Sequence, residues 1–134
     1  MSDTNTFSNQ KGSRGHIEIF LYRAPKKNHD GMLEVNRQSL DFFIKHGASS
    51  FEVFSLTSRE NMMEFVNLSK TISASEDEVW LEIQSYRDAI HVKEFTASME
   101  GDKSLEPLYK QFMELITPGS IVSFGGFGKI EEIS

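Results

Sequence analysis

The stretch HIEIFLYRA, residues His16–Ala24, decides the fold of this chain. Its residues alternate between an aliphatic set and a set of aromatic, polar and charged residues. The first set is Ile17, Ile19 and Leu21, and the second is His16, Glu18, Phe20 and Tyr22. A period of two with β-branched and aromatic residues is typical of a β-strand, and Pro25 ends the pattern. The sequence therefore predicts a first strand whose two faces differ in chemistry.

The same pattern predicts four further strands. They cover Phe51–Leu56, Phe65–Ile72, Val79–Ile83 and Ile121–Ile130. The last of them is interrupted by a motif that contains Gly125, Gly126, Phe127 and Gly128, and its spacing is not that of a phosphate-binding loop. Glycines inside a strand are typical of a bulge or of close approach to the backbone. We expect a bulged or bent strand there, with a backbone contact to a ligand as the alternative.

Three helices are predicted between the strands. The first runs from an N-cap at Asn28 to Gly47 and has an apolar stripe on one side. The second begins at Ser85–Asp88, which resembles a capping box, and ends near Gly101. The third spans Leu105–Ile116 and is short and strongly amphipathic.

The predicted order of elements is β-α-β-β-β-α-α-β. Without one hairpin strand and the short third helix, this is the βαββαβ plan of the ferredoxin-like fold. We therefore expect an α+β fold with an antiparallel sheet, one extra strand and a short extra helix. The length of 134 residues fits one domain, which we place at residues 16–134. Residues 1–15 contain only two apolar side chains, Met1 and Phe7, so we expect a flexible tail.

The composition excludes several classes of protein. The chain has 20 acidic and 14 basic residues and a formal net charge of −6, whereas binding to nucleic acid or to an anionic membrane needs a basic face. It has no cysteine, which rules out disulfides and thiol chemistry. No apolar run approaches the length of about 18 residues that spans a bilayer, and no signal-peptide core follows Met1. We expect a cytoplasmic protein that binds neither nucleic acid nor membranes.

The two faces of the predicted sheet suggest a homodimer. The helices of a βαββαβ domain cover one face, for which we expect the aliphatic set Ile17, Ile19, Leu21, Val79, Leu81 and Ile83. The other face then carries His16, Glu18, Phe20, Tyr22, Trp80, Glu82 and Gln84. Large aromatic residues on that face would form an apolar patch, which a second copy would cover by packing sheet against sheet. We expect a homodimer with a partly polar enclosure between sheet and partner, where a small organic molecule could bind.

Several motifs carry a resemblance to a known family. They are the opening strand with Glu18, Phe20 and Pro25, the segment His46-Gly47-Ala48, the segment Glu76-Asp77-Glu78-Val79 before a strand with Ile83, and Phe124-Gly125-Gly126-Phe127. Over Gly15–Glu132 the chain resembles the YbaA-like family of small bacterial proteins of unknown function. It departs from that family at Ser85-Tyr86-Arg87, where an aromatic-Pro-Ser sequence is usual, and in the 57–64 loop. The resemblance implies a homodimer with the dimeric α+β barrel form of the ferredoxin-like fold, and it implies no particular activity.

Four side chains are the strongest candidates for chemistry: His16, Glu18, Glu52 and Glu82. One imidazole with several carboxylates could bind a divalent metal, or it could supply a general base with a raised pKa if buried beside Trp80. The alternative, which we favour, is that the carboxylates accept structural hydrogen bonds. Together with Phe20, Tyr22 and Trp80, these four residues form the candidate lining of a ligand-binding interior. We assign no catalytic residue and expect no metal and no cofactor.

Three functions fit these expectations. The first is the binding of a small organic molecule. The second is a cofactor-independent monooxygenase or an isomerase-like enzyme, which rests on analogy with related barrels. The third is a non-catalytic structural or regulatory homodimer whose interior is packed. A cavity of a few hundred Å³ would separate the first two functions from the third.

Overall fold

A computed structural model of the chain describes residues 14–133. Over these residues it contains four strands, three α-helices and three short 3-10 helices. The strands are β1 (His16–Pro25), β2 (Ser50–Ser55), β3 (Asp77–Tyr86) and β4 (Val122–Gly128), and the helices are α1 (His29–Lys45), α2 (Ala89–Glu100) and α3 (Leu105–Leu115). None of the described helices has the length and apolar character needed to cross a membrane. The expected N-terminal tail lies almost entirely outside the described residues.

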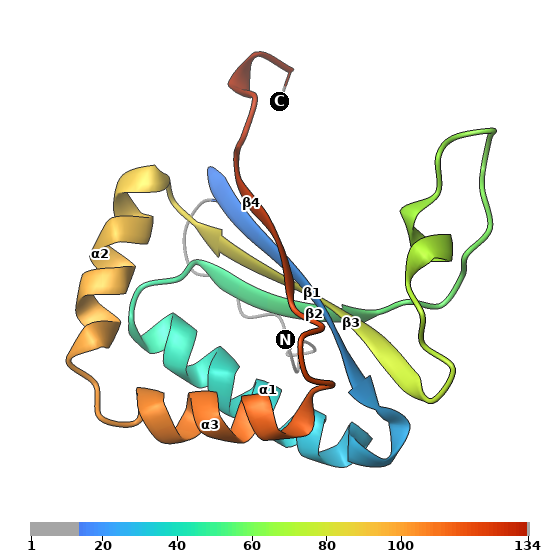
Figure 1. The fold of residues 1–134 in the computed structure, drawn as a ribbon. Coiled ribbons are helices and arrows are strands. Elements are labelled where there is room, and N and C mark those ends of the chain that lie inside the picture. The colour runs from blue at the N-terminus through green and yellow to red at the C-terminus, as the bar shows by residue number, and fades with distance from the viewer. Residues whose placement is uncertain (1–13, 134) are drawn as a thin grey trace, which may run out of the picture.

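The strands form one antiparallel sheet in the order β2-β3-β1-β4. The two central strands, β1 and β3, pair along their whole length, from His16 with Tyr86 to Pro25 with Asp77. Figure 1 shows the three helices together on one side of this sheet. The protein is thus an α+β molecule with a four-stranded antiparallel sheet and three helices, which is compatible with the ferredoxin-like fold.

The core lies between the sheet and the helices in two clusters. In one cluster, Tyr22 of β1 and Trp80 of β3 pack against Met32 of α1. In the other, the ring of Tyr86 at the end of β3 meets the ring of Phe95 of α2 edge-on, with 5.3 Å between the ring centres. The helices are therefore held to the sheet mainly by large aromatic side chains, which bury the most apolar area per residue.

The prediction of which sheet face meets the helices is wrong. The helices cover the aromatic and polar set, because Tyr22, Trp80, Glu82 and Gln84 are all buried on their side. The aliphatic set of Ile17, Ile19, Leu21, Leu81 and Ile83 lies on the opposite face, which we call the open face. The physical reason is that Tyr22, Glu82, Gln84 and Tyr86 on the covered face bond to one another, which compensates the cost of burying their polar groups.

Residues 57–76, called the arm below, join β2 to β3 and rise on the open side of the sheet (Figure 1). The strand predicted at Phe65–Ile72 is wrong, because this part of the arm is a loop with one short 3-10 helix. The Arg59 guanidinium donates hydrogen bonds to the backbone carbonyls of Ser69 and Ile72. A side chain thus satisfies carbonyls that a neighbouring strand would otherwise bind, and the sheet has four strands rather than five.

The start of the second helix also differs from the prediction. Ser85 is not a cap, because β3 continues through it to Tyr86. Asp88 alone caps α2, and its carboxylate accepts a hydrogen bond from the backbone N–H of His91 at 3.0 Å. A single acceptor at this position is enough to satisfy one free N–H of the first turn.

The glycine motif of β4 forms the predicted bulge. The register between β1 and β4 shifts between Ile19 and Phe20, and Gly125 has a φ of +83°. That region of φ is open to glycine and disfavoured for residues with a Cβ. The prediction of a bulged final strand is confirmed.

Candidate functional site

A cavity of about 290 Å³ lies between the sheet and the helices. Its floor is formed by Phe20 and Tyr22 of β1 and by Glu82 and Gln84 of β3. The rest of its lining is Ser39, Phe42, Phe43, Met99, Leu105, Leu108, Tyr109, Phe112 and Ile121. Walls that are mostly apolar, with a few polar groups gathered in one place, are typical of a small-molecule site.

The polar groups of the floor belong to a buried chain of hydrogen bonds. The Tyr86 hydroxyl donates to Oε1 of Gln84 at 2.8 Å, and the Gln84 amide donates to Oε2 of Glu82 at 2.6 Å. At the far end, the Tyr22 hydroxyl lies between two acceptors. Its hydrogen bond with Glu82 lowers the pKa of that carboxyl, as a donor does, and Oδ1 of Asn36 is 3.5 Å away. The strands place these residues side by side, because Glu82 and Gln84 lie two apart on β3 and Phe20 and Glu82 are register partners.

Burial gives the Glu82 carboxyl an unusual acidity. Removal from water raises the pKa of Glu82 to about 7, although the hydrogen bonds with Gln84 and Tyr22 act in the opposite direction. A carboxyl group with this pKa can be neutral or ionised near neutral pH, so it can give or take a proton.

The two buried tyrosines, Tyr22 and Tyr86, stay in their neutral form. Burial raises the pKa of Tyr86 far above its usual range, and the charges of Glu82 and Glu18 add to this effect. The pKa of Tyr22 is also raised well above its usual value, first by burial and then by the charge of Glu82. Both hydroxyls are therefore hydrogen-bond donors at any physiological pH.

His16 and Glu18 form a second polar pair on the same face, nearer to solvent. The Nε2 atom of His16 and the Oε2 atom of Glu18 are 2.6 Å apart, and both side chains are partly exposed. They lie across the backbone of β4 at Gly126, where an added Cβ would stand 2.6 Å from the Glu18 carboxylate and 2.8 Å from the His16 ring. The motif thus has a second role that its spacing did not reveal, because Gly126 leaves room for this pair.

The structure brings together most of the predicted site residues but not all. His16, Glu18, Phe20, Tyr22 and Glu82 share the covered face, as their alternation predicted. Glu52 lies on the open face, because its register partner is Ile83, and it pairs there with Arg14 at 3.6 Å. Trp80 is on the covered face but belongs to the packed core rather than to the cavity.

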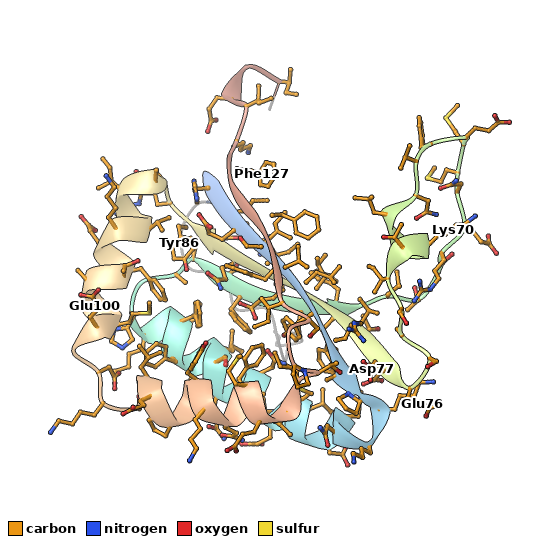
Figure 2. The ribbon with its side chains drawn as sticks, in the orientation of Figure 1. Lys70, Glu76, Asp77, Tyr86, Glu100 and Phe127 are labelled. Atoms are coloured by element: carbon orange, nitrogen blue, oxygen red, sulfur yellow. The ribbon has the colours of Figure 1, made fainter. Side chains whose placement is uncertain are left out.

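Tyr86 and Asn36 are members of the site that the sequence analysis missed. Tyr86 continues the alternation of β3 by two residues, so a longer strand would have placed it on the covered face. Its labelled side chain in Figure 2 lies on the helix side of the sheet, whereas Phe127 projects from the opposite side. Asn36 had no comparable signal, because a polar residue on a helix is usually assigned to solvent.

A separate cluster joins a serine, a histidine and an aspartate at the ends of α1 and α2. Nδ1 of His46 is 2.6 Å from Oγ of Ser98, and Nε2 is 2.8 Å from Oδ2 of Asp102. A hydrolytic triad also needs backbone N–H groups aimed at an oxyanion, whereas the ends of these two helices present carbonyls. The Asp102 pKa is held well below its usual range, chiefly by hydrogen bonds from Ser104 and then by His46. We therefore interpret this cluster as a polar contact that holds the two helix ends together.

Within residues 14–133, no three His, Asp or Glu side chains are grouped closely enough to hold a metal ion. The His16–Glu18 pair supplies only two candidate ligands, and the Glu82 carboxyl is occupied by its two hydrogen-bond partners. The chemistry available at this site is therefore that of neutral donors, one titrating carboxyl and an apolar cavity.

Comparison with known proteins adds no assignment to this geometry. No protein-family model matches the chain, and no curated protein matches it.

Proposed function

We propose that this chain binds a small organic molecule in the cavity between its sheet and its helices. The observation that carries the proposal is the combination of apolar walls with a buried carboxyl and amide, Glu82 and Gln84, at the floor. A volume of about 290 Å³ is close to the lower end of the range for ligand pockets, and a molecule of two fused rings fits it. A purely structural homodimer would have no need of such a void.

Titration of the protein with 2-ethylnaphthalene, followed by amide NMR, tests this proposal. We expect saturable shifts centred on residues that line the cavity, such as Leu108 and Phe112. Ser39→Leu places a larger side chain in the cavity and should abolish the shifts. Gln38→Leu, on the neighbouring exposed position of the same helix, is the matched control and should leave them intact. If the probe does not bind, or binds equally to the Ser39 variant, the cavity is not a ligand site.

We further propose that two copies pack through their open faces to form a dimeric α+β barrel. Three aromatic side chains on or beside this face, Phe54, Phe124 and Phe127, are 45–50% exposed. The apolar surface continues into the arm, because Leu68 and Ile72 of the arm line one groove with Leu21 and Leu81 of the sheet. A second copy of the same face is the partner that this mostly apolar surface fits, because a two-fold axis brings the same surface of both copies together.

The area of this surface supports the dimer. Beyond this groove, the arm carries further apolar side chains, Met62, Met63, Phe65 and Val66, which are 64–97% exposed. With Phe54, Phe124, Phe127, Val122 and Leu68, the exposed apolar area is on the order of 1,000 Å², and a second copy would cover the part of it that lies on the open face. A standard stable interface needs about 800 Å² per partner.

Light scattering coupled to size-exclusion chromatography tests the dimer. Phe124→Asp puts a charge on the open face at a position that is exposed in the single copy, so the variant should fold and elute as a monomer. Ile90→Asp, at a 65% exposed position of α2 on the other side of the molecule, is the control and should remain dimeric. A monomeric wild type at all concentrations would overturn the proposed interface.

An isomerase-like activity is the second candidate, and the Glu82 carboxyl favours it over a monooxygenase. A carboxyl with a pKa of about 7 can take a proton from a carbon next to a carbonyl and return it. The matching assay follows deuterium incorporation into the methyl group of 2-acetylnaphthalene in heavy water at pH 8. Incorporation by the wild type and none by Glu82→Gln supports the enzyme, whereas equal slow rates leave only binding.

A further inference from the structure

Among the described residues that line the cavity, Glu82 alone can carry a charge near neutral pH. This lining contains no Lys, Arg or His, and Glu82 takes part in none of the ion pairs between described residues. Glu18, on the same face of the sheet, differs because it has the His16 ring at 2.6 Å. A buried carboxylate without an opposite charge is costly, so an ionised Glu82 favours the entry of a cation.

The hydrogen bonds of Glu82 do not balance its charge. The Gln84 amide nitrogen donates to Oε2 of Glu82 at 2.6 Å, and its direction is fixed because the Gln84 carbonyl accepts from the Tyr86 hydroxyl at 2.8 Å. The Tyr22 hydroxyl is the other group that is hydrogen-bonded to Glu82. Both groups are neutral. A carboxylate has about four acceptor sites, so part of its capacity is left for a ligand.

Aromatic rings form much of the wall around this carboxylate. They come from β1, α1 and α3, so they lie on several sides of the cavity. The faces of aromatic rings carry partial negative charge and attract cations. The six rings are those of Phe20, Tyr22, Phe42, Phe43, Tyr109 and Phe112.

We propose that the cavity binds an organic cation, an amine whose ammonium group pairs with the Glu82 carboxylate while its apolar body lies among the aromatic rings. This inference rests on the proposed ligand binding in the cavity. An ammonium group has three hydrogens to donate as well as a charge. Ser39 of α1 offers a further acceptor, because its own hydroxyl hydrogen goes to the Val35 carbonyl at 2.8 Å. An anionic ligand would meet Glu82 and find no cation in the described lining.

Three probes of one shape separate charge from hydrogen bonding. 2-(Aminomethyl)naphthalene carries an ammonium group where 2-(hydroxymethyl)naphthalene has a neutral hydroxyl and 2-ethylnaphthalene has a methyl group. At pH 8 the amine is protonated, and most of Glu82 is ionised because its pKa is about 7. In amide NMR titrations of the wild type, we expect the amine to bind about tenfold more tightly than the ethyl compound. The amine should also bind severalfold more tightly than the alcohol.

Two variants locate the charge that is responsible. Glu82→Gln keeps the shape of the side chain and removes its charge. It should lose the preference for the amine and still bind 2-ethylnaphthalene, which shows that its cavity is intact. Glu106→Gln is the matched control, because it removes a carboxylate from an exposed position of α3 outside the lining. It should keep the preference, although the net charge of −6 attracts cations to the whole molecule.

The outcomes separate this inference from the proposed function. If the amine binds the wild type no more tightly than the other two probes, the inference is wrong while the ligand site stands, and this comparison needs no variant. If the preference persists in Glu82→Gln, or is lost equally in Glu106→Gln, the charge of Glu82 is not its cause and the inference is overturned. If none of the probes shifts the cavity residues, the proposed function fails and the inference fails with it.

Discussion

On one face of the sheet polar side chains are buried, and on the other face apolar side chains are exposed. The covered face carries Tyr22, Glu82, Gln84 and Tyr86, which are polar or amphipathic and nearly all inaccessible to water. The open face carries aliphatic side chains, with exposed phenylalanines beside them. Hydrophobicity alone would place the aliphatic face inside. The difference teaches that a polar set can be the interior one when its members form a closed chain of hydrogen bonds, because each group then keeps a partner in place of water.

The strongest test of this comparison uses two phenylalanines on one strand. Phe51 is 0% exposed on the covered face, with its ring centre 5.0 Å from that of Phe43, whereas Phe54, three residues later, is 48% exposed on the open face. We expect Phe51→Ala to lower the free energy of unfolding by about 3–5 kcal/mol. Phe54→Ala should cost less than about 1 kcal/mol in the monomer.

Urea unfolding of both variants, at a protein concentration low enough to keep the chain monomeric, measures the difference. If the proposed dimer forms, the loss of stability in Phe54→Ala should grow as the protein concentration rises, because the dimer covers this side chain. Equal costs for the two variants in the monomer would show that the faces are assigned wrongly.

The pH dependence of stability sharpens the comparison from the polar side. Burial raises the pKa of Glu82 from 4.5 to about 7, so the folded state binds its proton more tightly than the unfolded state does. The stability from this group is complete below pH 4.5 and is lost as the pH rises through 7. The total loss is about 3 kcal/mol.

Glu82→Gln isolates this effect, because it removes the titration and keeps a donor and an acceptor at the same place. As the pH rises from 4.5 to 8, we expect the free energy of unfolding of the variant to increase by about 3 kcal/mol relative to that of the wild type. Urea unfolding at each pH measures this difference. Subtracting the stability curve of the wild type from that of the variant also removes the contribution of Asp102, which has the opposite sign because its pKa is lowered. Parallel stability curves for the two proteins would contradict a raised pKa at Glu82.

The smallest change in stability is expected in the edge strand β4. A Cβ at Gly126 would meet Oε2 of Glu18 at 2.6 Å, whereas a Cβ at Gly128 would meet nothing within 4 Å. We expect Gly126→Ala to be about 1 kcal/mol less stable than Gly128→Ala, since the flexible ends of Glu18 and His16 can move aside. The His16 ring resonances should shift in the first variant only, and shifts in both would show that the close contact is not the cause.

Much of the fold follows from the alternation of residue types, but the orientation of the sheet does not. A period of two separates Ile17, Ile19 and Leu21 from Glu18 and Phe20 without saying which set meets the helices. That choice depends on partners distant in the sequence, such as Asn36 on α1 and Gln84 on β3. Side-chain hydrogen bonds between separate elements have no periodic signal, so a single sequence does not reveal them.

The candidate site was predicted in part for the same reason. Side chains two residues apart on a strand lie on the same face, which is a local property of the sequence. This alternation predicted the shared face of His16, Glu18, Phe20, Tyr22 and Glu82. The exclusion of Trp80 from the cavity depends on how α1 and α3 are packed, which is not local. The strand predicted at residues 65–72 shows the opposite kind of error. The local pattern is that of a strand, but the segment has no neighbouring strand with which to pair.

The bulge in β4 also bears on how large an assembly this chain can form. β4 is the last strand of the sheet in the described chain, and an unpaired strand edge can serve as a template for another molecule. The left-handed turn at Gly125 breaks the regular spacing of donors and acceptors along that edge. Growth by adding strands edge to edge is thereby discouraged, whereas pairing through the open face uses up that surface on both copies. In the proposed dimer, association ends at two, and the glycine motif discourages strand addition at the β4 edge.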